Sequence, residues 1–171
     1  MNYKSVVFNI LHLCCCQILF ASIPITDGLV VHLDADTLAL ADGAAVSSWG
    51  TFSAAAGQEA TYVASNSSYN GLATVHFDGS NDTLISSTVP FNVGSVTMFA
   101  VGNFTLDGAN QYLVACQDGG GDDRMRFAVD SGFEFRIGNS GWRAINTGIA
   151  DELVHIFSIT SAAQGFLDGL S

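Results

Sequence analysis

Basic side chains are nearly absent from this sequence. Five lysines and arginines stand against sixteen acids, and Lys4 lies in an N-terminal stretch that we expect to be removed. Proteins bind nucleic acid by neutralising phosphates with basic side chains, so this balance argues against nucleic acid as a partner. It argues equally against an anionic membrane surface. Cations, neutral ligands and polar ligands are the partners that the charge permits, although acidity also keeps an exported protein soluble.

Cysteine is scarce outside the first residues. Cys14, Cys15 and Cys16 lie in the apolar run 6–23, which follows a short positive region and ends in small residues before Pro24. This layout predicts a secretory signal peptide over residues 1–23, and a retained membrane anchor is the alternative. We therefore expect residues 24–171 to be a secreted or cell-surface domain with no membrane insertion after signal removal. Only Cys116 then remains, so the domain has no internal disulfide.

No part of the mature sequence has the pattern of an amphipathic helix. Short segments rich in β-branched and aromatic residues are bounded by glycine, asparagine, aspartate and serine, which predicts an all-β sandwich formed by one domain. The chain stops just after the Asp168-Gly169 turn signal without a returning strand, so we expect a C-terminally truncated domain. The predicted strands are 28–34, 44–49, 58–64, 72–77, 93–104, 111–116, 124–129, 133–138 and 153–160, and residues 165–169 begin a further hairpin turn.

Two segments carry more specific expectations. Residues 93–104 (VGSVTMFAVGNF) are apolar on both alternating faces, which is typical of a central strand covered on both sides. Residues 75–84 (VHFDGSNDTL) have apolar flanks around a turn in which Gly79 accepts positive φ, which predicts a β-hairpin. The residues Asp78, Asn81 and Asp82 can hold such a turn or bind an ion, and the turn is favoured.

Parity fixes the register of the hairpin around residues 130–132. An odd loop pairs apolar with apolar residues, setting Val129 opposite Phe133, Phe127 opposite Phe135 and Met125 opposite Ile137. A second turn at residues 139–140 then sets Trp142 against Ile137. By the same parity, the other face receives all four arginines of the mature chain, Arg124, Arg126, Arg136 and Arg143.

This arginine face is a candidate ligand-binding site. Like charges that face each other, as Arg126 and Arg136 do, are unfavourable unless something negative lies between them. An anionic ligand such as an acidic polysaccharide can supply that charge through bidentate contacts with Arg126, Arg136 and Arg143. Compensation by Glu134 and by acids of neighbouring strands is the alternative.

The loop 118–123 is the candidate for a metal. Asp118, Asp122 and Asp123 supply three carboxylates around three glycines, and calcium prefers oxygen ligands gathered by flexible backbone. An ordinary solvated loop is the alternative reading.

Catalytic signals are lacking. Polysaccharide cleavage needs two neighbouring carboxylates, whereas Glu59, Glu134 and Glu152 each stand alone on their segments. The Asp34 and Asp36 pair lies at a predicted strand end, where a turn or an ion site is favoured. Cys116 has no activating motif, and the histidines (His32, His76 and His155) lack metal-ligand spacing, so structural roles are favoured. We therefore expect no enzyme.

The ordered motifs resemble those of the laminin-G-like members of the concanavalin A-like lectin and glucanase superfamily. They are GLVVHLDA at 28–35, VSSW at 46–49, Asn70-Gly71, VHFDGSNDTL at 75–84, TMFAV at 97–101 and HIFSI at 155–159. The resemblance implies a two-sheet antiparallel jelly roll on exported proteins, often with a calcium ion, that recognises glycans or proteins. It departs from the family after Trp49, where Thr51 replaces a frequent aspartate.

Together these observations predict a secreted, non-catalytic module that binds a glycan or an extracellular protein. The alternatives are a structural or adhesive domain with no ligand of its own, and a fragment of a polysaccharide-cleaving enzyme.

Overall fold

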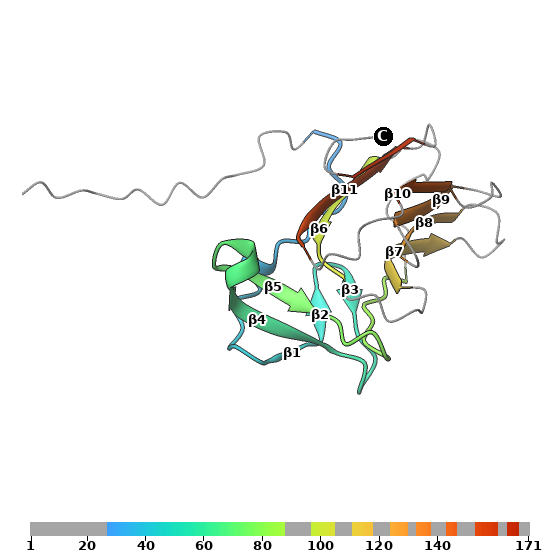
Figure 1. Cartoon of the computed structure of the whole chain (residues 1–171). Helices are drawn as coiled ribbons and strands as arrows, with labels where there is room; N and C mark the ends of the chain where they lie inside the picture. Colours follow the sequence, from blue (N-terminus) through green and yellow to red (C-terminus); the bar gives the residue numbers. More distant parts are fainter. Residues whose placement is uncertain are drawn as a thin grey trace, which may run out of the picture.

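The computed structural model describes residues 27–87, 97–104, 111–117, 124–129, 133–137, 143–146, 153–160 and 164–167 (Figure 1). Regular structure in these ranges is strand or short 3-10 helix, which confirms the predicted all-β class. The 3-10 helices are η1 (Ala35–Leu38) and η2 (Ser67–Tyr69). The strands are β1 (Ala45–Val46), β2 (Ser48–Trp49), β3 (Phe52–Ser53), β4 (Ala60–Asn66), β5 (Leu72–His76), β6 (Thr97–Gly102), β7 (Gln111–Gln117), β8 (Arg124–Val129), β9 (Phe133–Ile137), β10 (Arg143–Asn146), β11 (His155–Thr160) and β12 (Gln164–Leu167). The predicted signal peptide, residues 1–23, lies outside the described residues.

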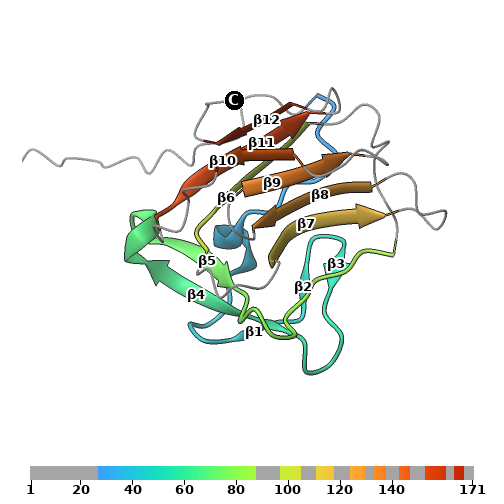
Figure 2. The same ribbon diagram turned by 45° about the vertical axis from the view of Figure 1, so that its right-hand side comes forward.

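The described strands pair antiparallel in four sheets. Their orders are β1-β4-β5, β2-β3, β10-β9-β8-β7 and β12-β11-β6. Figure 2 shows β7 to β10 side by side, with β11 and β6 lying next to each other in the neighbouring sheet. The C-terminal half of the chain therefore forms two sheets. One contains β7 to β10, and the other contains β11 and β12 together with the earlier strand β6.

Aromatic rings join these two sheets. Phe133 of β9 and Phe157 of β11 are fully buried, and their ring centroids lie 4.7 Å apart. Phe104 adds an edge-to-face contact with Phe157 at 5.4 Å. Burying a phenylalanine side chain contributes about 1.5–3 kcal/mol, so this cluster is a main source of the attraction between the sheets.

A smaller core lies under the first sheet. Val46 of β1 pairs with Ala60 of β4, and both are fully buried. Tyr62, two residues along β4 from Ala60, is also buried, because alternate residues of a strand point to the same face. The alternation of β4 therefore fixes which side of this sheet faces inward.

The predicted first strand, residues 28–34, is wrong. Gly28 lies in a turn with a φ of +77°, the residues after it form no strand, and Leu29 and Val30 are 45% and 54% exposed. Asp34 instead caps η1, because its carboxylate accepts a hydrogen bond from the Asp36 backbone N–H at 3.0 Å. The Trp49 indole N–H also donates to the Asp34 carbonyl at 3.3 Å. Apolar composition alone does not supply the partner that a strand needs for its backbone groups.

The predicted strand 44–49 is divided between two sheets. Its first part is β1, and its second part is β2, which turns sharply and pairs with β3 so that Trp49 faces Phe52. Gly50 makes this turn possible with a φ of +61°, a conformation that side chains disfavour.

The predicted hairpin at residues 75–84 is also wrong. After the turn the chain does not pair back onto β5; Ile85 instead forms a bridge with Ser53 through two backbone hydrogen bonds of 2.9 Å. Thr83 likewise donates to the Gln58 carbonyl at 2.9 Å. The local turn is as expected, but the partner of the next segment is chosen by contacts distant in sequence.

Two further differences concern the last sheet. Among the described residues β6 lies at its edge, although residues 93–104 were expected to form a central strand. The segment expected to begin a turn at 165–169 is largely the strand β12, which pairs with β11 so that Phe157 faces Leu167. Asp-Gly at 168–169 follows this strand and lies outside the described residues.

Candidate ligand-binding faces

The hairpin between β8 and β9 has the predicted register. Val129 pairs with Phe133, Phe127 with Phe135 and Met125 with Ile137. This register also sets Arg126 opposite Arg136. The buried side chains of Phe133 and Phe135 identify the phenylalanine rows as the core side of the sheet.

Arg143 does not share the arginine row, which corrects the expectation. It pairs with Phe135, whereas a two-residue turn would have set it opposite Arg136. A shift of one residue moves a strand position to the other face of the sheet, because side chains alternate. The register therefore brings together Arg126 and Arg136 and separates Arg143 from them. Trp142 lies outside the described residues.

Glu134 belongs to the face of the arginine pair. It precedes Arg136 by two residues on β9, and it pairs with Ala128 and Ala144 on the neighbouring strands. Its side chain is half-buried. The register places this carboxylate one row away from the arginine pair, and compensation by Glu134 stays a prediction.

The most exposed aromatic side chain among the described residues lies elsewhere, on β6. Phe99 is 74% exposed, Val101 is 58% exposed, and Ile156, which pairs with Val101 from β11, is 54% exposed. The intervening residues of β11, Phe157 and Ile159, are fully buried. One side of this sheet thus faces the core and the other carries apolar side chains in solvent. We call the latter the outer face; by register its positions are Thr97, Phe99, Val101, Ile156, Ser158, Thr160, Gln164 and Phe166.

Polar groups without charge flank this apolar strip. Ser158 pairs with Phe99, and Thr160 pairs with Thr97 on β6 and Gln164 on β12. The Thr160 hydroxyl is buried and has no hydrogen-bond partner in the described part of the chain. An unsatisfied hydroxyl beside a solvent-facing strip is unusual, because buried polar atoms are normally hydrogen-bonded. Sequence reasoning missed the outer face because an apolar strand covered on both sides has the same pattern.

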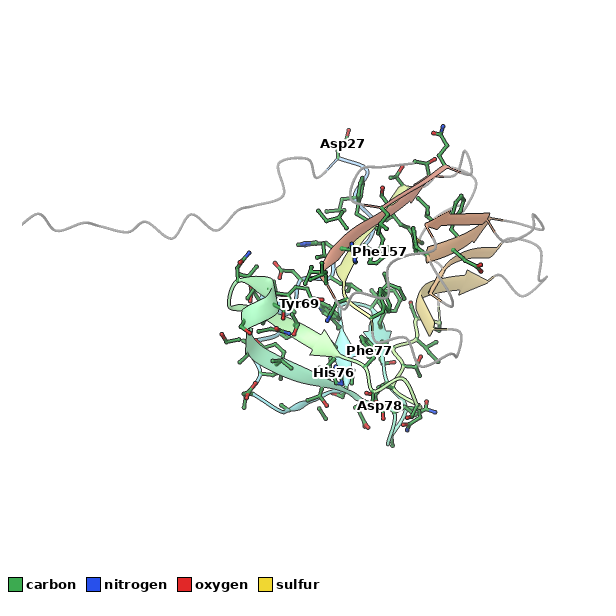
Figure 3. All side chains as sticks on the ribbon, viewed as in Figure 1. Asp27, Tyr69, His76, Phe77, Asp78 and Phe157 are labelled. Carbon is green, nitrogen blue, oxygen red and sulfur yellow. The ribbon has the colours of Figure 1, made fainter. Side chains whose placement is uncertain are left out.

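The turn after β5 is held by one carboxylate. Asp78 accepts hydrogen bonds from the backbone N–H groups of Ser80 at 2.8 Å and Asn81 at 3.2 Å, and its own N–H donates to Asp82 at 2.9 Å (Figure 3). The Ser80 N–H, helped by those of Asn81 and Asp82, lowers the pKa of the Asp78 carboxyl. The Asn81 amide donates to the Gly57 carbonyl. The favoured structural role of these residues is therefore confirmed.

The carboxylates of this turn hold backbone. Asp78 Oδ1 and Asp82 Oδ2 each accept from backbone N–H groups, which ties both side chains to the turn. The described residues contain no group of three or more acidic, histidine or cysteine side chains that can hold a metal. The loop with Asp118, Asp122 and Asp123 lies outside the described residues, so calcium binding there stays a prediction.

Two further carboxylates and one histidine have contacts within the fold. Asp36 accepts from the Ala73 N–H at 2.8 Å, and Glu59 accepts from the Gly57 N–H at 2.7 Å, so both carboxylates hold backbone. His155 lies half-buried with its ring 6.1 Å from that of Phe157. His32 and His76 are exposed.

A tyrosine links η2 to the end of β6. The Tyr69 hydroxyl donates to the side-chain oxygen of Asn103 at 2.8 Å. Partial burial raises the pKa of Tyr69. Asn103 directly follows β6, so this contact holds the end of the strand that carries the outer face.

Comparison with known proteins matches the chain to no family model, no curated protein and no solved structure. The laminin-G-like resemblance therefore rests on the sequence motifs. In the part of the chain that the structure describes, no helix is long and apolar enough to cross a membrane.

Proposed function

We propose that the protein is an exported, non-catalytic module that binds a carbohydrate or another extracellular surface ligand. Its scaffold is a two-sheet jelly roll of the laminin-G-like, concanavalin A-like kind. The antiparallel pairing of the described strands and the contact between Phe133 and Phe157 across two sheets support such a scaffold. The order of the sequence motifs supports the family.

The exposed apolar strip of the outer face carries the functional proposal. Phe99, Val101 and Ile156 are each more than half exposed and lie on neighbouring positions of paired strands. Isolated apolar residues on a surface need no explanation, but a contiguous group flanked by polar residues marks a site of interaction. A structural domain with no ligand of its own has no need of such an exposed apolar group.

A glycan array tests this function. The secreted full chain is applied with and without a calcium chelator, and specific binding to a subset of glycans is expected. The chelator arm tests the predicted calcium loop at the same time, since lost binding assigns the ion a role. Absence of binding to every glycan, and to extracellular matrix proteins printed beside them, identifies a structural or adhesive domain. Release of new reducing ends from the bound glycan identifies an enzyme fragment instead.

A further inference from the structure

We propose that the outer face binds an uncharged polysaccharide, with the Phe99 ring stacking against a sugar ring. This inference rests on the proposed function and names its ligand class. It differs from the acidic polysaccharide that the arginine face alone would suggest.

Charge selects the ligand class. The outer face has no ionisable side chain, whereas the whole chain carries a formal net charge of −11. An anionic polymer therefore finds no cation on this face and is repelled by the rest of the protein. The arginines lie on strands β8, β9 and β10 of another sheet. A second copy of the chain would bring the same negative charge, so a neutral ligand is the occupant that fits.

The strip suits the apolar side of a sugar ring. Phe99 and Val101 are two residues apart on β6, about 7 Å along the strand, and Ile156 lies beside Val101 at roughly 5 Å. A pyranose presents C–H groups on its faces and hydroxyls around its edge. The faces of aromatic rings carry negative partial charge that attracts such C–H groups, so Phe99 offers a stacking platform.

The flanking residues suit the hydroxyl edge. Ser158 stands between Phe99 of β6 and Phe166 of β12 in the register, and Thr160 stands between Thr97 and Gln164, so uncharged donors and acceptors lie next to the apolar side chains. The Thr160 hydroxyl lacks a partner among the described residues. Rotation about its χ1 exchanges the hydroxyl with the methyl group, and a sugar hydroxyl can then satisfy it. An apolar strip with uncharged polar borders thus matches both sides of the ligand.

Isothermal titration of the secreted full chain tests the proposal. The uncharged probes are soluble mixed-linkage β-glucan, xyloglucan, galactomannan and dextran, and the charged probes are carboxymethylcellulose and dextran sulfate. We expect at least one uncharged probe to bind, and F99A to weaken this binding roughly tenfold or more, as loss of a central aromatic contact does. Replacement by another aromatic residue, F99W, retains binding. The matched control is F77A, because Phe77 is 43% exposed on a different element.

The outcomes separate the two proposals. Binding restricted to the charged probes, or an uncharged probe bound equally by F99A and wild type, overturns this inference and leaves the proposed function standing. No binding to any glycan overturns this inference, and absence of binding to the matrix proteins on the array as well overturns the proposed function. Urea unfolding of F99A shows whether the variant is folded. If F99A is unfolded, the binding of F99W to the uncharged probe is the measurement that tests the role of the aromatic ring. A dimer that F99A dissociates would assign the face to a second copy and also overturn the inference.

Discussion

Phe133 and Phe157 approach each other from two different sheets, with ring centroids 4.7 Å apart and planes inclined at 57°. Both rings are fully buried, and each lies on a strand whose neighbouring positions face away from the core. This single contact relates the sheet that bears the arginine pair to the sheet that bears the outer face. This contact, with that of Phe104 on Phe157, holds the two sheets together through buried aromatic rings.

Replacing Phe157 by alanine should therefore destabilise the fold strongly. We expect the free energy of unfolding to fall by about 3–5 kcal/mol, the range for a fully buried phenylalanine. Urea denaturation followed by fluorescence measures this loss. The matched variant is Phe99→Ala, which removes the same atoms from a side chain that is 74% exposed and should change stability little. Equal losses in the two variants would contradict the assignment of inner and outer faces.

Asp78 should make stability depend on pH in the acid range. Hydrogen bonds from backbone N–H groups, that of Ser80 first, lower its pKa in the folded state, so the folded protein favours the ionised carboxylate. This stabilisation is complete above the unfolded value of about 4 and is lost as pH falls through the lowered folded pKa. Urea midpoints between pH 2 and pH 7 should fall less steeply at the acid end in Asp78→Asn. Asp27→Asn is the charge-matched control, and an effect equal to that of Asp78→Asn would argue against this origin.

Tyr69 should act at the opposite end of the pH scale. Burial raises its pKa, so folding favours the protonated phenol, and stability is lost as pH rises through the raised value above about 10. Tyr69→Phe removes this dependence and the hydrogen bond to Asn103, at a cost of about 0.5–1 kcal/mol at neutral pH. Alkaline difference absorbance locates the tyrosine titration. Tyr62→Phe serves as the tyrosine control, and an unchanged alkaline profile in Tyr69→Phe would contradict the prediction.

Arg126 and Arg136 occupy opposite positions in the register of β8 and β9. Reversing the charge of one of them therefore tests whether the two like charges destabilise the sheet. Arg126→Glu should stabilise the sheet by about 0.2–1 kcal/mol, because an opposite pair replaces a like pair. Arg143→Glu is the control, since its register position lies opposite Phe135. If Arg126→Glu destabilises, Glu134 already compensates the arginines, and reversing one of them breaks that arrangement.

The double substitution of Arg126 and Arg136 by glutamine tests the anionic-ligand alternative. We expect binding of uncharged glycan to persist, with at most a small change in stability. Dextran sulfate titration of the wild type and the double variant measures any anionic site. A large loss of dextran sulfate affinity would show that the arginine face is a binding site of its own.

Local chemistry predicted local structure well. The odd loop between β8 and β9 required apolar residues to face each other, and the pairs Phe127–Phe135 and Val129–Phe133 follow this rule. The Asp78 turn likewise forms because its side chain can reach its own backbone. In both cases the contacts that determine the structure lie within a few residues of one another, so the local sequence is sufficient to predict them.

Long-range partners were not predictable from the same patterns. The segment after the Asp78 turn was expected to pair back onto β5, yet its Ile85 forms a bridge with Ser53. Nothing in the local sequence 75–84 indicates this distant partner. The apolar alternation around Phe99 fits a covered central strand as well as an edge strand with one face in solvent. Periodicity reports which residues share a face, but only the assembled sheets decide whether that face is buried.

The pairing of β6 with β11 has a consequence for the order of folding. Thr97 meets Thr160 only after β7, β8, β9 and β10 have been synthesised between them. Closing so long a connection is entropically slow, whereas β4 and β5 are joined by a short segment and can pair early. During synthesis the β6 strand, TMFAVG, is therefore an uncharged segment that stays unpaired until β11 has been made. An apolar strand that stays unpaired so long is the kind of segment through which incompletely folded chains aggregate.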